Sequence, residues 1–315
     1  MKPKTKSKYT VLTDIEHVLK RPDTYGGSVT EETWKINLTG SVQEVTVVPM
    51  LFKIFDEALV NAADNYTRKS GTTSIDVTIS KEGSFSIRNN GKTVPVRKHP
   101  IKDALTGKKI YTPEMVFFRM RAGQNFDDDE ERYEGGRNGI GIKLASIFST
   151  HAELSCCDGK KVLNATYTDN MTNRQTVEIK DNEFKWEPYT LYGSTIDLQR
   201  FSVDDKPLQE IPDDVLKLMT RRVVDIAACC AGVNVRLNDN EISLHGMGGR
   251  FKCYAIKQLG TDPLFYSQKK NWSVAVGLTE RDAETKNISF VNNVWTRLDG
   301  THVECVKDEI CKVLM

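Results

Sequence analysis

Three polar residues at a spacing of four could form a small catalytic or cation-binding cluster. Glu57, Asn61 and Asn65 recur at every fourth position, so in a helix they lie on one face. A carboxylate can orient a water molecule and accept its proton. Carboxamide oxygens can bind a hard cation, or lie beside phosphate without adding negative charge. A merely polar helix face is the alternative interpretation of this pattern taken alone.

Two further motifs could add a ligand contact and a phosphate-binding turn. Asn90 and Gly91 end a strand pattern, where an amide can face the edge of a ligand, although a simple Asn-Gly turn gives the same sequence. The run 135–143, GGRNGIGIK, opens a helix, so its backbone N–H groups could approach phosphate while Arg137 and Lys143 add positive charge. It lacks the GK[ST] of a Walker A loop and follows an acidic loop rather than a strand. A glycine-rich hinge is the alternative.

The hydrophobic pattern predicts the elements that would position these residues. Apolar residues repeat with a helical period over about 50–68 and again over 213–229. Alternation at 75–79 and 85–87, on either side of a short turn, predicts a β-hairpin. Further strands are expected at 152–157, 162–167, 176–180, 195–198, 273–278 and 288–292, and further helices at 143–150, 251–257 and 302–313.

Hairpins mixed with helices favour an α+β fold with two layers over a doubly wound parallel sheet. The length of 315 residues suggests two domains, and the pattern changes after a strand near residue 235. We therefore expect one domain over 1–235 and a smaller one over 236–315.

Composition excludes several classes of protein. The 44 Lys and Arg against 43 Asp and Glu leave a net charge of +1, which argues against a histone-like protein or an acidic tail protein. The longest apolar runs are too short to span a membrane, and the N-terminal lysines precede no secretory signal. Seven cysteines without a CxxC spacing disfavour a structural zinc site and indicate a reducing, intracellular compartment.

Taken in order, the three motifs resemble the ATP-binding motifs of type IIA DNA topoisomerases. Residues 55–65 (FDEALVNAADN) are similar to the first motif, 90–96 to the second and 135–150 to the third. The resemblance extends to 19–25, 289–293 and 300–303, so it covers nearly the whole chain. It is strongest to the branch of eukaryotes, large viruses and T-even phages.

This resemblance implies a Bergerat-type two-layer α/β sandwich ATPase domain over 1–235, followed by the N-terminal part of a smaller α/β transducer domain over 236–315. The expected activity is binding and hydrolysis of ATP with Mg²⁺. ATP binding would join two copies of the chain and gate the passage of a DNA duplex. The expected partners are a second copy, double-stranded DNA and the breakage–reunion region or subunit of the enzyme.

The resemblance also implies roles for single residues. Glu57 would be the general base, Asn61 would hold Mg²⁺ and Asn65 would contact phosphate, while Asn90 and Ser194 would read adenine. The remaining expected nucleotide contacts are Asn125, Arg137, Asn138, Gly139, Ile140, Gly141 and Lys143. Tyr9 would reach the site of the partner subunit, which makes the N-terminal segment a dimer arm.

Departures from the family pattern leave other interpretations open. Thr93 stands where the family has glycine, and Gly123-Gln124 replace a pair of serines. In the family, the transducer supplies a Gln-Thr-Lys loop whose lysine reaches the γ-phosphate. No Gln-Thr-Lys tripeptide occurs in this sequence, so we expect this chain to bind ATP and hydrolyse it slowly. The alternatives are a mismatch-repair or heat-shock-type ATP clamp, or a nucleotide-binding interaction module without turnover. The compartment is left open between the cytoplasm of a bacterial host, a nucleus and a viral factory.

Overall fold

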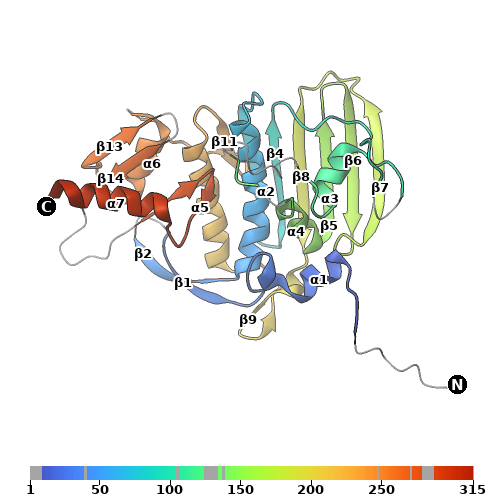
Figure 1. Cartoon of the computed structure of the whole chain (residues 1–315), viewed down its shortest axis with the longest axis horizontal. Helices are drawn as coiled ribbons and strands as arrows, with labels where there is room; N and C mark the ends of the chain where they lie inside the picture. Colours follow the sequence, from blue (N-terminus) through green and yellow to red (C-terminus); the bar gives the residue numbers. More distant parts are fainter. Residues whose placement is uncertain are drawn as a thin grey trace.

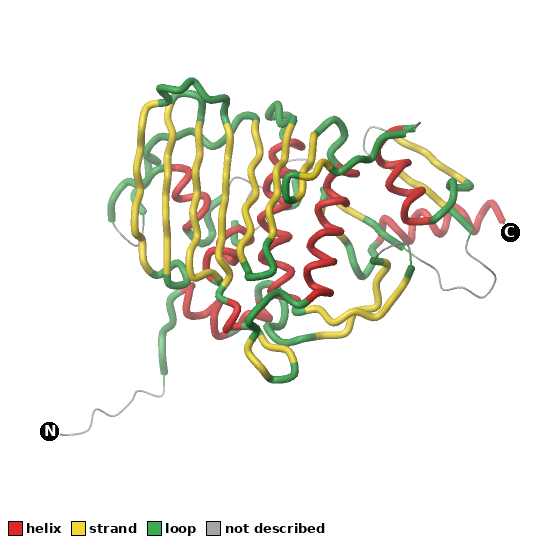
Figure 2. The backbone as a smooth tube through the Cα atoms, turned by 180° about the vertical axis from the view of Figure 1, so that it is seen from behind, coloured by secondary structure: helices red, strands yellow, loops and turns green. Residues whose placement is uncertain are grey.

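One broad sheet carries helices on a single face, and a set of smaller elements follows at the C-terminal end (Figure 1, Figure 2). The structure is a computed structural model that describes residues 9–38, 41–103, 107–123, 134–136, 139–246, 248–269, 272–278 and 287–314. The mixture of helices and strands confirms the predicted α+β class. None of the helices in these ranges is both long and apolar enough to cross a lipid bilayer.

The main sheet has eight strands in the order β12-β11-β3-β4-β8-β5-β6-β7. Neighbouring strands are antiparallel except for β11 and β3, which run parallel. The strands are β3 (Ser74–Ile79), β4 (Ser84–Asn90), β5 (Ser149–Cys157), β6 (Lys161–Thr168), β7 (Asn173–Asp181), β8 (Tyr189–Ile196), β11 (Asn234–Leu237) and β12 (Asn240–Glu241).

Two long helices pack beside each other on this sheet. The first is α2 (Pro49–Thr67), whose Pro49 suits the first turn because the missing N–H would have no helical partner there. The second is α5 (Asp213–Cys229), whose apolar stripe is buried as its period predicts. Phe55 of α2 meets Phe85 of β4 edge to face at 5.5 Å between ring centres, which fixes α2 on the sheet.

Shorter elements surround this core. Before α2 come α1 (Asp14–Lys20) and the antiparallel hairpin of β1 (Glu32–Asn37) and β2 (Val42–Val47). Between β4 and β5 lie α3 (Thr112–Phe118) and α4 (Gly141–Ile147). The pair β9 (Ser202–Val203) and β10 (Lys206–Pro207) forms a small projecting hairpin (Figure 1).

The C-terminal elements are small and locally paired. They comprise α6 (Gly249–Leu259), β13 (Phe265–Gln268) with β14 (Ser273–Val276), β15 (Phe290–Val291) with β16 (Val294–Trp295), and α7 (Thr301–Leu314). Strand β11 spans the expected boundary at residue 235, and β12 continues the main sheet to residue 241. The division into two domains stays a prediction.

Several sequence-based boundaries differ from the structure. The helix expected over 143–150 ends at Ile147, because Ser149 already pairs with Ile196 in β5. The strand expected over 195–198 is the end of β8, which begins at Tyr189. The hairpin β1–β2 and helix α3 were not predicted, since neither has a long periodic apolar pattern.

Candidate functional site

The carboxylate of Glu57 lies against the start of α4. A Cβ atom at Gly141 would overlap the Glu57 carboxyl group, so only glycine allows this approach of α4 to α2. Lys53 Nζ lies 2.6 Å from Glu57 Oε1, and the Glu57 side chain keeps 23 % of its surface exposed. The structure therefore brings together the expected base and the glycine-rich turn, and leaves the base partly open to water.

Asn61 and Asn65 follow Glu57 along the same helix. Asn61 Nδ2 donates to the backbone carbonyl of Glu57 at 2.8 Å, which turns the amide along the helix toward the Glu57 end. Asn65 Nδ2 donates to Thr72 Oγ1 at 3.1 Å, in the connection between α2 and β3. Asn61 is thus placed close to Glu57, whereas Asn65 also holds the end of its own helix.

Lys143 lies in α4 with its side chain almost completely buried. Its ammonium group donates to the carbonyl oxygen of Ala122 at 2.6 Å. Burial lowers the pKa of Lys143 to about 7, and the negative charge of Glu57 opposes that shift. A lysine with this pKa changes its charge near neutral pH, so an anion beside it would bind together with a proton.

The glycine-rich turn is described only in part. Gly139 has a φ of 60°, a left-handed conformation that suits glycine, and Ile140 precedes the first residue of α4. The Ile140 carbonyl accepts from Lys143 N at 2.9 Å, so this segment leads directly into the helix. Asn125, Arg137 and Asn138 lie outside the described residues.

Asn90 is used by the fold itself. Its Oδ1 accepts from Thr73 N at 2.8 Å and from Ser74 N at 2.9 Å, and its Nδ2 donates to Thr73 Oγ1 at 2.8 Å. The amide thereby ties the end of β4 to the start of β3. These bonds occupy the groups that a ligand edge would need, so the structure gives no support to Asn90 as an adenine contact.

The neighbouring Asn89, which the sequence interpretation did not single out, lies on the opposite face of β4. It is buried and shares the inner face of β4 with Phe85 and Ile87, the face that α2 covers. Directly opposite, on β8, lies Thr190. The alternation of apolar residues at Phe85 and Ile87 was the available signal in the sequence, because it places Asn89 on the helix side of β4 and Asn90 on the other.

Two hydroxyl groups meet beside Asn89. Thr93 Oγ1 lies 2.6 Å from Thr190 Oγ1 and 3.3 Å from Cys156 Sγ. The extra side chain at this family glycine position therefore has a polar partner in the fold. Burial raises the pKa of Cys156 to about 12, so its thiol stays neutral at physiological pH.

Ser194 lies on β8, directly opposite Phe85 of β4. It is buried, and its Oγ lies 2.5 Å from Ser149 Oγ, which in turn bonds the carbonyl of Ala145. These bonds join β8, β5 and α4. The structure thus places Ser194 on the helix-covered face, with its hydroxyl engaged in the fold.

Asp64 is a second residue that the sequence interpretation missed. Its carboxylate accepts from Gly135 N at 2.9 Å and from Gly136 N at 3.1 Å. Burial raises the pKa of Asp64 to about 6, against the effect of these two hydrogen bonds. The helix that carries Glu57 therefore also holds the first residues of the glycine-rich run.

Tyr9 is the first residue that the structure describes. It is 85 % exposed. The segment before α1 leads away from the sheet in Figure 1. A contact of Tyr9 with the site of a partner subunit stays a prediction.

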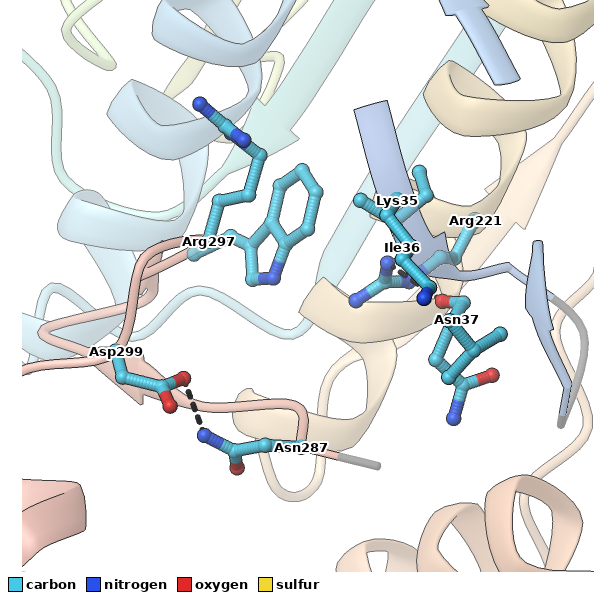
Figure 3. A pocket seen from close by; sticks show the side chains of 9 residues that line it. Lys35, Ile36, Asn37, Arg221, Asn287, Arg297 and Asp299 are labelled. Atoms are coloured by element: carbon cyan, nitrogen blue, oxygen red, sulfur yellow. Dashed lines mark hydrogen bonds between the residues drawn. The ribbon is translucent and has the colours of Figure 1, made fainter. Parts of the chain in front are cut away.

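A separate hollow lies between β1, α5 and the segment 287–299 (Figure 3). Arg221 stacks its guanidinium over Trp295 at 4.6 Å and donates to the Asn37 carbonyl at 2.9 Å. None of the expected site residues lines this hollow; its lining is Lys35, Ile36, Asn37, Val42, Arg221, Asn287, Trp295, Arg297 and Asp299. The candidate site is the group of Glu57, Asn61, Gly141 and Lys143 on the two helices (the α2–α4 cluster), rather than this hollow.

Sequence comparison matches this chain to a family of ATPases and to individual DNA topoisomerases. Residues 46–182 match the family "Histidine kinase-, DNA gyrase B-, and HSP90-like ATPase". The chain is 37 % identical over 320 residues to DNA topoisomerase 2-beta of Mus musculus, and the match covers 98 % of this chain and 19 % of the relative. It is 38 % identical over 320 residues to DNA topoisomerase 2-alpha of Mus musculus, covering 98 % and 20 %. The chain thus spans about a fifth of the length of these relatives.

Solved structures match over most of their length. The ATPase region of Saccharomyces cerevisiae topoisomerase II has a TM-score of 0.85 at 35 % identity, covering 98 % of this chain and 80 % of that one. The ATPase and transducer domains of topoisomerase II from Balamuthia mandrillaris have a TM-score of 0.86 at 34 % identity, covering 98 % and 78 %. This chain therefore belongs to the type II DNA topoisomerases and matches their ATPase region.

Proposed function

We propose that this chain binds ATP with Mg²⁺ on the α2–α4 cluster and hydrolyses it. The observation that carries the proposal is the contact of the Glu57 carboxylate with Gly141, at the first residue of α4. Phosphoryl transfer to water depends mainly on placement and charge neutralisation, which a base beside a glycine-rich turn can supply. Membership in the family of topoisomerase ATPase regions supports the same activity.

The residues divide the work by their chemistry. Glu57 would orient the attacking water and accept its proton, since its carboxylate is partly exposed at the turn. Lys143 and the described glycines Gly139 and Gly141 would face the phosphates, together with Arg137, Asn138 and Asn125. Ile140 would contribute through its backbone, and Asn65 would approach a phosphate through its amide.

The metal fits Asn61 by donor chemistry. The Asn61 amide nitrogen donates to the Glu57 carbonyl, so its oxygen is the atom left for a hard cation. Mg²⁺ held there would neutralise phosphate charge. Because Glu57 lies one helical turn away, Asn61 would set the distance between the cation and the base.

For adenine we propose Asn89 in place of Asn90. Asn89 faces the helices and lies opposite Thr190, whereas the amide of Asn90 bonds the start of β3. Ser194 would support the neighbouring strand through its hydroxyl rather than touch the base.

At the level of the whole protein, we propose that the chain is part of an enzyme that acts on double-stranded DNA as a dimer. The relatives named DNA topoisomerase 2 support this, and the breakage–reunion region or subunit would be the functional partner. The exposed Tyr9 suits an arm that reaches a second copy. Residues 1–235 would form the ATP-binding domain and 236–315 the first part of the transducer.

The test replaces Glu57 by glutamine. Single-turnover hydrolysis with protein in excess over ATP should fall at least about 100-fold, the usual contribution of a general base. Binding of a non-hydrolysable ATP analogue, measured by calorimetry, should change less than about threefold. Glu178→Gln, at an exposed glutamate of β7, is the matched control and should leave both values unchanged. Equal hydrolysis by Glu57→Gln and the unaltered protein would remove Glu57 from this role.

A further inference from the structure

The entry to the glycine-rich run is held from two sides. Residues Glu134, Gly135 and Gly136 lie between the C-terminal half of α2 and the turn that joins β15 to β16. These two elements are more than 200 residues apart in sequence, since Asn293 contacts Thr67 across 226 positions. A late part of the chain therefore touches the run that precedes α4.

The α2 side of this contact is a carboxylate that accepts two successive backbone N–H groups. Asp64 Oδ1 accepts from Gly135 N, and Oδ2 accepts from Gly136 N. Asp64 is 1 % exposed, so water does not compete for these bonds. Arg68, the C-cap residue that follows α2, approaches Glu134 with 3.4 Å between Nε and Oε1. Carboxylate and guanidinium thus fix both the backbone and a side chain of the entry.

The C-terminal side contributes shape and one amide. A Cβ atom at Gly135 would lie 2.6 Å from Val294 Cγ2 and 3.1 Å from the Asn292 carbonyl oxygen, so the turn packs directly on this glycine. Asn292 Nδ2 donates to the Glu134 carbonyl at 3.4 Å. The contact requires glycine because any side chain would push the turn away.

The turn itself is rigidly attached to the core. Asn292 and Asn293 have φ values of 50° and 64°, as in the tight turn of a two-residue hairpin. The Asn293 carbonyl accepts from Arg222 Nη2 at 3.0 Å, and Asn293 Nδ2 donates to Thr67 Oγ1 at 2.9 Å. A turn bonded in this way can hold the glycine-rich run in place rather than follow it.

We propose that Asp64 and the Asn292–Asn293 turn position Gly135 and Gly136, at the start of the glycine-rich run, for the phosphates of the nucleotide. The inference rests on the proposed ATP site and deepens it: Asp64 is a positioning residue, and the C-terminal hairpin is part of the nucleotide site although it supplies no contact to the substrate. Glycines lose much conformational freedom when ordered, and holding them before binding removes that cost from the affinity.

The experiment compares Asp64→Asn, Asn292→Ala and the double variant. An asparagine at 64 can accept only one of the two glycine N–H groups, because its NH₂ group faces the other donor. We expect about tenfold weaker binding of a non-hydrolysable ATP analogue for Asp64→Asn and about threefold for Asn292→Ala. The double variant should lose less than the product of the two, because both act on one segment. The rate constant at saturating ATP should stay within about threefold, since Glu57 is on α2 and does not move.

The control is Asp197→Asn. The Asp197 carboxylate accepts from Arg200 and Asn170 and contacts neither the run nor the turn, so its loss reports stability alone. Hydrogen exchange of the Gly135 and Gly136 amides should accelerate in Asp64→Asn and stay unchanged in Asp197→Asn.

The possible failures are distinguishable. If the unaltered protein binds no analogue, the proposed function is wrong. If the unaltered protein binds it and both single variants keep its dissociation constant within twofold, the positioning role alone is wrong. The positioning role is also overturned if affinity falls equally in Asp197→Asn at matched loss of thermal stability.

Discussion

Asp56 and Glu57 are adjacent on α2, yet their carboxylates lie in opposite surroundings. Asp56 points into a buried ionic layer, where Arg222 Nε donates to it at 2.8 Å and the same guanidinium approaches Asp225 at 3.3 Å. Glu57 points to the partly exposed cluster beside α4, with Lys53 as its neighbour. Because successive residues of a helix point about 100° apart, α2 can place a stabilising carboxylate and a candidate catalytic carboxylate on two different faces.

Asp225 has further partners in the buried ionic layer, among them Arg221, whose Nε lies 3.4 Å from Asp225 Oδ2. Tyr254 donates to Asp225 at 2.6 Å, and Arg222 also donates to the Asn293 carbonyl. Burial alone would lower the pKa of Arg222, but the charges of Asp56 and Asp225 outweigh burial and raise it. A layer of this kind tolerates no missing partner, whereas the cluster around Glu57 keeps groups open for a ligand.

The largest expected effect on folding comes from breaking the buried layer. Arg222→Leu leaves the buried Asp56 without its cation and leaves Asp225 with only Arg221, so the free energy of unfolding should fall by about 3–5 kcal/mol. Urea denaturation measures this. Lys217→Met removes an exposed ion pair to Asp214 on the same helix and should cost less than about 1 kcal/mol. Similar losses in the two variants would contradict the contrast between the regions.

Gly141→Ala tests the other face of α2. The added methyl group must displace the Glu57 carboxylate, and a misplaced catalytic group costs about 100-fold in turnover. Folding should change by only about 1 kcal/mol, because the end of a flexible side chain can move. In the Glu57→Gln background the same substitution should reduce turnover no further. An additive loss would show that Gly141 acts on something other than Glu57.

Nucleotide binding should take up a proton through Lys143. Its pKa of about 7 rises when a phosphate lies beside the ammonium, so at pH 8 binding should take up close to one proton per nucleotide. Affinity should be flat below pH 7 and fall as the pH rises above it, by at most about tenfold per unit. Calorimetry in two buffers of different ionisation enthalpy measures the uptake. Lys143→Met should abolish it, and uptake that persists in this variant would assign the proton to another group.

The smallest expected effect is that of Lys53→Met. Lys53 and Glu57 form a pair at 2.6 Å in which both side chains keep part of their surface in water. Such pairs contribute less than about 1 kcal/mol to folding. Urea denaturation should therefore place this variant near the unaltered protein. A loss as large as that of Arg222→Leu would mean that the two faces of α2 do not differ in stability as we infer.

The sequence predicted those features that a repeated local pattern encodes. Helices α2 and α5 follow from their apolar period, and the period of four put Glu57 and Asn61 on one face. The helix predicted at α4 was too long, because Ser149 already belongs to β5 and pairs with Ile196 of β8. A local sequence pattern does not report such a non-local pairing.

Single-residue assignments depended on which way a side chain turns. Asn89 and Asn90 are both amides before a glycine, and only the alternation along β4 tells their faces apart. Asp64 was missed because its partners are backbone N–H groups about 70 positions away. Contacts of this kind leave no mark of residue type at the distant partner except a preference for glycine.

The anchoring of Asp56 limits how the molecule can respond to a nucleotide. A rotation or translation of α2 that moves Glu57 would also pull the adjacent Asp56 carboxylate away from Arg222. The helix is therefore held in place. Any rearrangement when a nucleotide binds must then occur in the segments that face α2. Glu57 would keep its position, and the facing segments would bring the nucleotide to it.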